Sequence, residues 1–262
     1  MILGFIGTGK MGGALARAAS KNAGNTVLLA NRHPEKAEGL ASETGGEVNS
    51  NSGVAGTADF IFLGVKPGML GEVAGQIRDT LKERDSRYVI VSMLAGTTME
   101  TICRELGTDC PVIRIMPNIP VAAGEGTILF AANSAATQED KEAFLSAMKF
   151  SGKFYEIEEK LIDAGSAVSG CGPAFAAMFI EALADGGVAC GLPRAAAIEY
   201  AAQMTAGTAR LILEGGISPA GLKDAVCSPG GTTIQGVRTL EENAFRGGVM
   251  DAVIAAYEKT IE

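Results

Sequence analysis

A short glycine-rich turn near the start of the sequence is the first feature whose residue types and spacing could do chemistry. Gly7, Gly9 and Gly12 follow the apolar run Ile2–Ile6 and open a helix predicted over Gly12–Ala23. In a strand–turn–helix of this spacing, the first glycine permits the tight turn and the second lets the backbone approach a pyrophosphate, while the third allows close helix–strand packing. The helix N-terminus, with its free N–H groups, favours the bound anion. We therefore predict a dinucleotide site, the alternative being a glycine turn that binds no ligand.

The residues that follow the second predicted strand, Thr26–Ala30, indicate which dinucleotide is bound. A site for NAD usually carries an Asp or Glu at this position, which accepts hydrogen bonds from the ribose hydroxyls. This sequence has Asn31 and Arg32 instead. Asn31 could donate to a 2′-phosphate and Arg32 could pair with its charge. We predict NADP(H) as the cofactor, with NAD(H) possible at weaker affinity, and we expect the neighbouring His33 to be incidental.

A second candidate anion site lies far along the chain, at Ser228-Pro229-Gly230-Gly231-Thr232-Thr233. A Pro-Gly-Gly turn that opens a helix presents several unpaired N–H groups in one concavity, and such a nest binds an anion without Lys or Arg. Taken alone, the same segment could equally be an ordinary helix-capping turn.

The overall composition excludes several classes of function. The chain has 262 residues, a net charge of −8 and a pI near 4.9, which argues against a nucleic-acid surface because that would need clustered Lys and Arg. The five cysteines form no CxxC pair and are odd in number, so we expect buried thiols in a reducing compartment. No apolar run reaches the length of about 18–20 residues that is needed to cross a bilayer. We expect a cytoplasmic, soluble protein with no membrane or nucleic-acid partner and no metal.

Two regions with different periodicity must position these turns. In the first, near-continuously apolar strands alternate with amphipathic helices, which predicts a doubly wound α/β domain of the Rossmann type over residues 1–158. The remaining strands are predicted at Phe60–Val65, Tyr88–Ser92, Val112–Met116, Ile128–Ala131 and Phe154–Ile157. The remaining helices of this region are predicted at Pro34–Glu43, Leu70–Lys82, Thr98–Leu106 and Gln138–Lys149.

The second region, residues 159–262, is predicted to be all-helical and rich in Ala and Gly. Small residues let helices approach closely but bury little area, so we expect this domain to complete its core by dimerisation, as a homodimer or a higher assembly of dimers. Its helices are predicted at Pro173–Ala189, Arg194–Glu214, Gly221–Val226, Thr233–Glu242 and Val249–Ile261.

Further motifs along the whole chain resemble one family. They are Lys66-Pro67, Ala95-Gly96, Met116-Pro117-Asn118-Ile119-Pro120, Ser169-Gly170-Cys171-Gly172-Pro173-Ala174-Phe175, and Leu222-Lys223-Asp224 with the Ser228–Thr233 turn. Together these look like pyrroline-5-carboxylate reductase. The resemblance implies an N-terminal Rossmann-like domain, a helical domain that interlocks with a second subunit, and an active site completed across the dimer. The implied reaction is NADPH-dependent hydride transfer to the C=N bond of 1-pyrroline-5-carboxylate, giving L-proline.

The resemblance also implies roles for individual residues. Ser228 and the amides of Gly230, Gly231 and Thr232 would hold the substrate carboxylate, and Thr233 would place its hydroxyl near the ring nitrogen as the catalytic residue. Asn51 would lie on the adenosine ribose side. The full set implied at the cofactor is Ile6, Gly7, Thr8, Gly9, Lys10, Met11, Asn31, Arg32, Asn51, Val65, Lys66, Pro67, Ala95, Gly96 and Asn118.

The sequence departs from the family pattern at three positions and leaves two other functions open. Leu94, Ile119 and Cys171 stand where Ala, Thr and Ser are common in the family. A dehydrogenase of β-hydroxy acids would use a helix-borne lysine such as Lys223 as acid and base, but would not require the Ser228–Thr233 turn. A redox-sensing NADP(H)-binding module would keep the glycine turn and Arg32 with no reason to keep that second turn.

Overall fold

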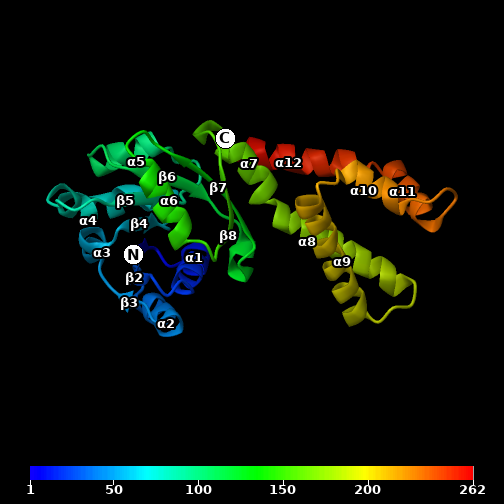
Figure 1. Cartoon of the computed structure of the whole chain (residues 1–262), viewed down its shortest axis with the longest axis horizontal. Helices are drawn as coiled ribbons and strands as arrows, with labels where there is room; N and C mark the ends of the chain where they lie inside the picture. Colours follow the sequence, from blue (N-terminus) through cyan, green and yellow to red (C-terminus); the bar gives the residue numbers. More distant parts are fainter. Residues whose placement is uncertain (262) are drawn as a thin grey trace. The chain divides into compact units, whose positions relative to one another are not determined.

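The computed structural model describes residues 1–261, and their contacts divide into two compact units (Figure 1). The first unit comprises Met1–Gly170 together with the end of the last helix from Tyr257 onward, and the second comprises Cys171–Ala256. The domain boundary predicted between residues 158 and 159 stays a prediction. The division into units reflects which residues contact one another, and it does not define where a family domain begins.

The first unit is built on one eight-stranded sheet with the strand order β3-β2-β1-β4-β5-β6-β7-β8. All neighbouring strands are parallel except β6 and β7, which are antiparallel. The predicted doubly wound α/β fold is therefore confirmed, with one antiparallel pair added near its edge. The strands are β1 (Ile2–Ile6), β2 (Thr26–Ala30), β3 (Glu47–Val48), β4 (Phe60–Leu63), β5 (Val89–Ser92), β6 (Val112–Met116), β7 (Gly126–Ala132) and β8 (Gly152–Glu156).

Helices cover both faces of this sheet, and each face has its own apolar core. One core gathers side chains of α1, α2 and α6, such as Leu15, Leu40 and Phe144, against the sheet. The other gathers side chains of α3, α4, α5 and α7, such as Ile77 and Ile102. The helices are α1 (Lys10–Ser20), α2 (Pro34–Thr44), α3 (Asn51–Thr57), α4 (Leu70–Lys82), α5 (Met99–Leu106), α6 (Gln138–Ala147) and α7 (Ile162–Ser169), with 3₁₀ turns η1 (Pro67–Met69), η2 (Ile119–Ala123) and η3 (Glu159–Leu161).

Three short elements, β3, α3 and the eight-residue helix α7, were not predicted. β3 has two exposed residues, too few to show an alternating pattern. α3 reads Asn-Ser-Gly-Val-Ala-Gly-Thr, which contains no strong helical pattern. The helix nevertheless forms because the Ser50 hydroxyl caps it by accepting from the Gly53 N–H, and because Val54 and Ala55 are buried against the sheet.

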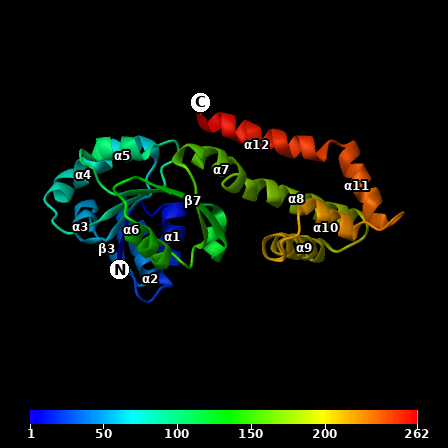
Figure 2. The ribbon, with the colours of Figure 1, turned by 45° about the horizontal axis from the view of Figure 1, so that its top comes forward.

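The second unit is all-helical, as predicted, and consists of α8 to α11 with most of α12 (Figure 2). Among residues 172–260, the buried apolar side chains are Ala184, Ala197 and Ala201, all of them small. Large apolar side chains such as Met178 are exposed in this single chain, at 68% for that residue. The helices are α8 (Gly172–Ala189), α9 (Arg194–Gly215), α10 (Pro219–Val226), α11 (Thr232–Glu242) and α12 (Phe245–Ile261).

The stretch Glu159–Ala189 corrects one expectation from the sequence. It contains a helical run of 31 residues with a mean hydropathy of 1.5 over its most apolar window, so it is long and apolar enough to cross a membrane by length and composition. We had expected no such stretch, because Gly, Ser and Cys residues interrupt its strongly apolar positions. Only 11% of that window is buried in the single chain. An exposed apolar helix face is equally what a dimerisation surface presents, so this property alone is weak evidence for a membrane.

The cysteines also differ from expectation. All five are free thiols, but Cys110 alone among them is buried, and Cys190 is exposed. Cys171, Cys190 and Cys227 belong to the helical unit, where much of the apolar surface is exposed in the single chain.

Candidate functional site

The turn between β1 and α1 is held by close backbone packing around the carbonyl of Gly7. The Gly7 N–H donates to the Ala30 carbonyl at 2.8 Å, and Gly7 has a φ of +98°, which a glycine adopts without strain. A Cβ atom on Gly12 would lie 2.2 Å from the Gly7 oxygen, and one on Gly64 would lie 2.5 Å from it. The turn can therefore form only because three glycines meet at this point, on β1, α1 and the end of β4.

The N-terminus of α1 is open to a ligand. Gly9 caps the helix with no side-chain hydrogen bond, and its carbonyl accepts from the Gly13 N–H at 2.8 Å. The N–H groups of Lys10, Met11 and Gly12 lie in the first turn and have no partner within the helix. A Cβ atom on Gly9 would meet nothing within 4 Å, so there is room for a group to approach the backbone. These residues fit a pyrophosphate.

A cavity of about 540 Å³ lies beside this turn, at the carboxyl ends of β1, β2 and β4. The chain crosses from one side of the sheet to the other between β1 and β4, which is where dinucleotides bind in this fold. The structure brings more than half of the predicted cofactor residues to this cavity. They are Ile6, Gly7, Gly9, Asn31, Arg32, Asn51, Val65 and Lys66.

Asn31 lines the cavity but holds the protein rather than standing free. Its Nδ2 donates to the Thr8 Oγ1 at 2.6 Å, and its Oδ1 accepts from the His33 N–H at 3.0 Å. Thr8 is buried beneath it. These bonds tie the end of β2 to the glycine turn, and because the amide of Asn31 has a second N–H, its predicted contact with a phosphate stays a prediction.

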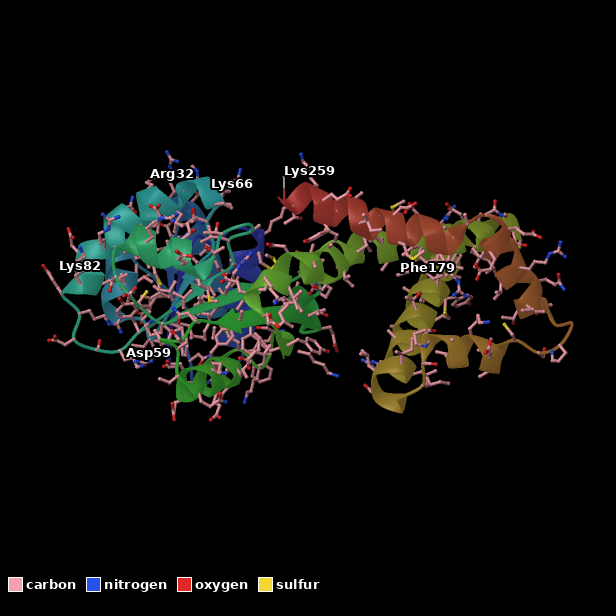
Figure 3. All side chains as sticks on the ribbon, turned by 90° about the horizontal axis from the view of Figure 1, so that it is seen from above. Arg32, Asp59, Lys66, Lys82, Phe179 and Lys259 are labelled. Carbon is pink, nitrogen blue, oxygen red and sulfur yellow. The ribbon has the colours of Figure 1, made fainter. Side chains whose placement is uncertain are left out.

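Arg32 is exposed at the rim of the cavity, and its guanidinium forms no ion pair within the described residues. Lys36, on the first turn of α2, lines the same rim and is likewise exposed and outside any recorded ion pair in that part of the chain. Figure 3 shows the side chains of Arg32 and Lys66 projecting from the same edge of the first unit. The rim of the cavity thus carries cationic side chains at two places, Arg32 and Lys36 after β2 and Lys66 after β4.

Several lining residues were missed by the sequence interpretation. Lys36 could have been found, because it lies one helical turn after Arg32. Gln76 could not, because it lies on α4 and reaches the cavity through the fold, where its Oε1 accepts from the Asn51 Nδ2 at 2.5 Å. The other residues missed are Ala30, His33, Asn49, Ser50, Gly64, Met69, Glu72 and Val73.

The remaining predicted cofactor residues do not line this cavity. Thr8, Lys10, Met11 and Pro67 are sequence neighbours of lining residues, and Ala95 and Gly96 form an exposed loop after β5.

Asn118, the last of these residues, is 6% exposed. Its Nδ2 donates to the Ser169 carbonyl at 2.9 Å and its Oδ1 accepts from the Thr127 N–H at 2.9 Å. Asn118 therefore bridges the end of β6 and the end of α7, and its expected contact with the cofactor stays a prediction.

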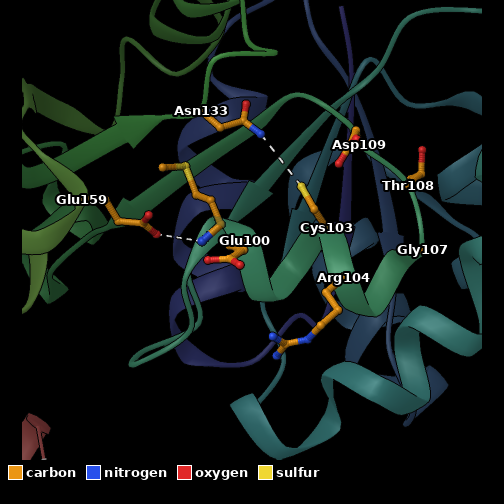
Figure 4. Close-up of a pocket in the computed structure, with 9 residues that line it drawn as sticks. Glu100, Cys103, Arg104, Gly107, Thr108, Asp109, Asn133 and Glu159 are labelled. Atoms are coloured by element: carbon orange, nitrogen blue, oxygen red, sulfur yellow. Dashed lines mark hydrogen bonds between the residues drawn. The ribbon is translucent and has the colours of Figure 1, made fainter.

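A larger cavity, of about 740 Å³, runs along α5 and is lined by none of the predicted residues (Figure 4). Cys103 lies in it, beside the buried Cys110. Burial, followed by the nearby Cys103, raises the pKa of the Cys110 thiol to about 12. A thiol with so high a pKa stays protonated and is a poor nucleophile, so this pair gives no reason to place the chemistry at this cavity.

In the second unit, the Ser228–Thr233 turn opens α11 as predicted. Gly231 caps the helix with no side-chain hydrogen bond, and Gly230 has a φ of +68°, a left-handed conformation suited to glycine. The Gly231 N–H donates to the Ser228 carbonyl at 3.0 Å, so that amide is already used in closing the turn. The N–H groups of Thr232 and Thr233 remain without helical partners. A Cβ atom on Gly231 would lie 2.4 Å from the Ser228 Oγ, which shows that this hydroxyl leans over the turn.

Lys223, on α10, is not prepared to act as a base. Its Nζ lies 2.7 Å from the Asp224 carboxylate, and this hydrogen-bonded carboxylate raises the pKa of Lys223 above its usual value. A general base must be neutral near the working pH. The lysine chemistry of a hydroxy-acid dehydrogenase therefore has no support at this position.

Comparison with known proteins agrees with this division of the chain. A family described as "NADP oxidoreductase coenzyme F420-dependent" matches residues 2–96, and one described as "Pyrroline-5-carboxylate reductase dimerisation" matches residues 159–262. Among curated relatives, the pyrroline-5-carboxylate reductase of Escherichia coli (strain K12) is 40% identical over 98% of this chain and 96% of its own length. That of Glycine max is 39% identical over 99% of this chain and 95% of its own length.

Solved structures of the same enzyme have the same fold. A pyrroline-5-carboxylate reductase from Coxiella burnetii superimposes with a TM-score of 0.90 at 29% identity, covering 98% of this chain and 96% of its own. The Plasmodium falciparum pyrroline carboxylate reductase, solved with NADP bound, gives a TM-score of 0.87 at 31% identity, covering 99% and 97%. With identity at this level over nearly the full length of both chains, the protein belongs to the pyrroline-5-carboxylate reductase family.

Proposed function

We propose that this protein reduces 1-pyrroline-5-carboxylate to L-proline with NADPH, the last step of proline biosynthesis. The observation that carries the proposal is the glycine-bounded cavity at the β1–β4 crossover, with Arg32 free at its rim, in a chain of this family. The amide groups at the start of α1 would hold the pyrophosphate. Arg32 and Lys36 would hold the 2′-phosphate.

The substrate is a small ring that carries a carboxylate and a C=N bond. We propose that the free amides of Thr232 and Thr233, with Gly230 and the Ser228 hydroxyl, bind the carboxylate at the start of α11. Gly231 has a different part, because its N–H keeps the turn closed. The anion is thus held by dipoles rather than by a lysine or arginine, which suits a protein of net charge −8.

Binding at this turn orients the ring for reduction. The bound dihydronicotinamide supplies hydride to C5 of the ring. The Thr233 hydroxyl would contact the ring nitrogen and hold its proton in place while the C=N bond becomes a C–N bond. No His, Asp or Glu belongs to the turn itself, so the proton is already on the ring nitrogen when the substrate binds, or it comes from water or from Thr233.

Hydride transfer requires that a substrate bound at the Ser228–Thr233 turn lies in contact with the nicotinamide. We propose a homodimer, or a higher assembly of dimers, in which the helical unit pairs with that of a second subunit and completes the site. The exposed apolar faces of α8 and α12 support this, as does the dimerisation family that residues 159–262 match. We propose the cytoplasm as its location, where the NADPH pool is reducing and thiols stay free.

A panel of substrates tests the function. With purified full-length protein, NADPH oxidation should require 1-pyrroline-5-carboxylate and should not occur with β-hydroxy acids or in the absence of substrate. Turnover with a hydroxy acid would favour the dehydrogenase alternative. NADPH binding without turnover of any substrate would favour a sensing module.

A further inference from the structure

A buried arginine interrupts the apolar face of the sheet in the first unit. Arg114, in β6, is 2% exposed and lies beside Ser92 of β5 in the sheet register. Its sequence neighbours two positions along the same face are Val112 and Met116, which pack into the apolar core with α5 and α7. A charged side chain in such a place is costly unless it is paired.

Two carboxylates pair with it. The Arg114 Nη2 donates to the Asp163 Oδ1 at 3.0 Å, and its Nη1 lies 3.5 Å from the Glu159 Oε1. The Arg114 Nε is buried without a hydrogen-bond partner among the described residues. Replacing a buried cluster of charged residues with apolar residues of similar size often leaves a protein equally stable. The incomplete pairing indicates that the group does something other than add stability.

Glu159 makes one further bond, and this bond reaches a loop of the proposed active site. Its Oε1 accepts from the Met99 N–H at 2.7 Å, drawn as a dashed line in Figure 4. Met99 is the first residue of α5, where N–H groups lack helical partners and favour a negative charge. Directly before it lies the exposed loop with Ala95 and Gly96, the residues expected at the nicotinamide.

Few hydrogen bonds fix that loop between its buried ends, Leu94 and Met99. Within it, the Thr97 hydroxyl lies 3.4 Å from the Ala95 carbonyl, and the Thr97 N–H donates to the Leu94 carbonyl at 3.4 Å, both long bonds. Gly96 has a φ of +65°, which most residues disfavour. The end of this loop is therefore held by two features of Met99, the burial of its side chain in the apolar core and the bond from its N–H to Glu159.

We propose that Arg114, Glu159 and Asp163 form a positioning device for the nicotinamide loop. Arg114 fixes the Glu159 carboxylate from inside the core, and Glu159 fixes the start of α5 and hence Ala95–Gly96. Glu159 is also the first residue matched by the dimerisation family, so the loop is anchored where the helical region begins. The inference rests on the proposed function for its effect on turnover, but not for its effect on loop order.

The test compares Glu159→Gln with Glu158→Gln in the full-length protein. Glu158 is the matched control because it is exposed and pairs with Lys160. Glu159→Gln weakens the charge-assisted bonds and should lower kcat at least about tenfold, since small misplacements of reacting groups cost large factors in rate. The Kd for NADPH should stay within about threefold, because phosphate contacts dominate binding. Glu159→Asp, which keeps the charge, should recover part of the kcat.

Amide exchange of the cofactor-free protein gives a readout that needs no substrate. The peptide covering residues 94–102 should exchange at least about tenfold faster in Glu159→Gln than in Glu158→Gln, while the peptide around Arg32 stays unchanged. The exchange measurement therefore tests the role of Glu159 separately from the proposed function. If wild type fails to reduce the pyrroline, the proposed function is wrong, and exchange still decides whether Glu159 orders the loop.

A second variant removes the donor together with the buried Met99 side chain, and Met99→Ala, which keeps the N–H, shows the effect of losing the side chain alone. Met99→Pro deletes the N–H that Glu159 accepts, at the first helical position where proline is tolerated. Thr98 before it has an extended backbone, with ψ of 157°, which suits the residue preceding proline. Met99→Pro should speed exchange and lower kcat as Glu159→Gln does. Unchanged exchange in residues 94–102 in both variants, or a kcat equal to that of Glu158→Gln, would overturn the proposal.

Discussion

At the scale of single residues, the molecule separates groups that bind a ligand from groups that hold the protein in shape. Asn31 and Asn118 look like ligand contacts in the sequence, yet both have their amide oxygen and nitrogen bonded to other parts of the chain. Arg32, in contrast, stands free at the cavity rim. The sequence predicts which residues reach the region, but not which are already bonded, because partners such as Ser169 lie far along the chain.

Arg32→Ala tests the cofactor preference at this scale. Loss of the guanidinium removes a charge-assisted contact to the 2′-phosphate, which NADH lacks, so kcat/KM should fall about tenfold or more with NADPH and little with NADH. Steady-state kinetics with both cofactors measures it. Lys21→Ala, an exposed lysine outside the cavity, serves as the control. An equal loss with both cofactors would contradict the 2′-phosphate assignment.

Thr233→Val tests the hydroxyl assigned to the ring nitrogen. The change keeps the shape of the side chain and its backbone N–H, so kcat should fall about tenfold or more while the Kd for NADPH holds. Thr239→Val, on the same helix with its hydroxyl bonded to the Gln235 carbonyl, is the matched control and should keep wild-type kcat. If the Thr233 and Thr239 variants have the same kcat and KM, the hydroxyl has no part in the reaction.

At the scale of elements, helices and strands with a strong apolar pattern were predicted correctly from the sequence, whereas short elements were missed. The elements β1, β2, β6 and α4 occur at their predicted bounds, because the three strands are runs of mostly buried side chains and the helix has a buried residue every three or four positions. β3 and α3 depend on pairing with β2 and on the Ser50 cap, which are tertiary or local geometric effects. The strand β7 was predicted at Ile128–Ala131, but its antiparallel direction could not be, since hydrophobic periodicity does not indicate the direction of a strand.

Two glycine variants test how the glycine turn is built. Gly12→Ala places a Cβ atom 2.2 Å from the Gly7 carbonyl, so the turn must open. Overpacking of this kind costs about 1–3 kcal/mol, and the Tm should fall by several degrees with at least about tenfold weaker NADPH binding. Gly39→Ala is the control, because Gly39 lies inside α2 with nothing within 4 Å of its Cβ position. It should raise stability by about 0.5–1 kcal/mol, since alanine is the better helix former. A Gly12→Ala protein with wild-type Tm and affinity would mean that the turn is looser than described.

At the scale of the whole molecule, the helical unit lacks a core of its own. Phe175, Met178, Leu183, Phe245 and Val249 line an apolar groove of about 670 Å³ between α8 and α12. Uncovered apolar surface of this extent marks an interaction site. The Ala- and Gly-rich composition predicted this need for a partner, although not which side chains would be exposed.

Dilution tests the need for a second subunit. Sedimentation of wild type should give a dimer or a larger assembly of dimers, and Met178→Glu should shift it toward monomer because a charge cannot be buried without a partner. Activity per chain should fall together with assembly. Tyr155→Glu, at an exposed aromatic residue of β8, is the control and should assemble normally. A wild-type monomer at all concentrations, fully active, would contradict the proposed assembly.

The central claim is that this chain reduces the C=N bond of a pyrroline carboxylate, and the product tests it most directly. Wild-type protein is given 1-pyrroline-5-carboxylate and NADPH that carries deuterium at both positions on C4 of the nicotinamide, and the product is analysed by chiral chromatography with mass spectrometry. The account predicts L-proline carrying deuterium at C5, formed in step with NADPH oxidation and faster than with NADH. Unreduced substrate after full incubation, or proline without the label, would contradict it.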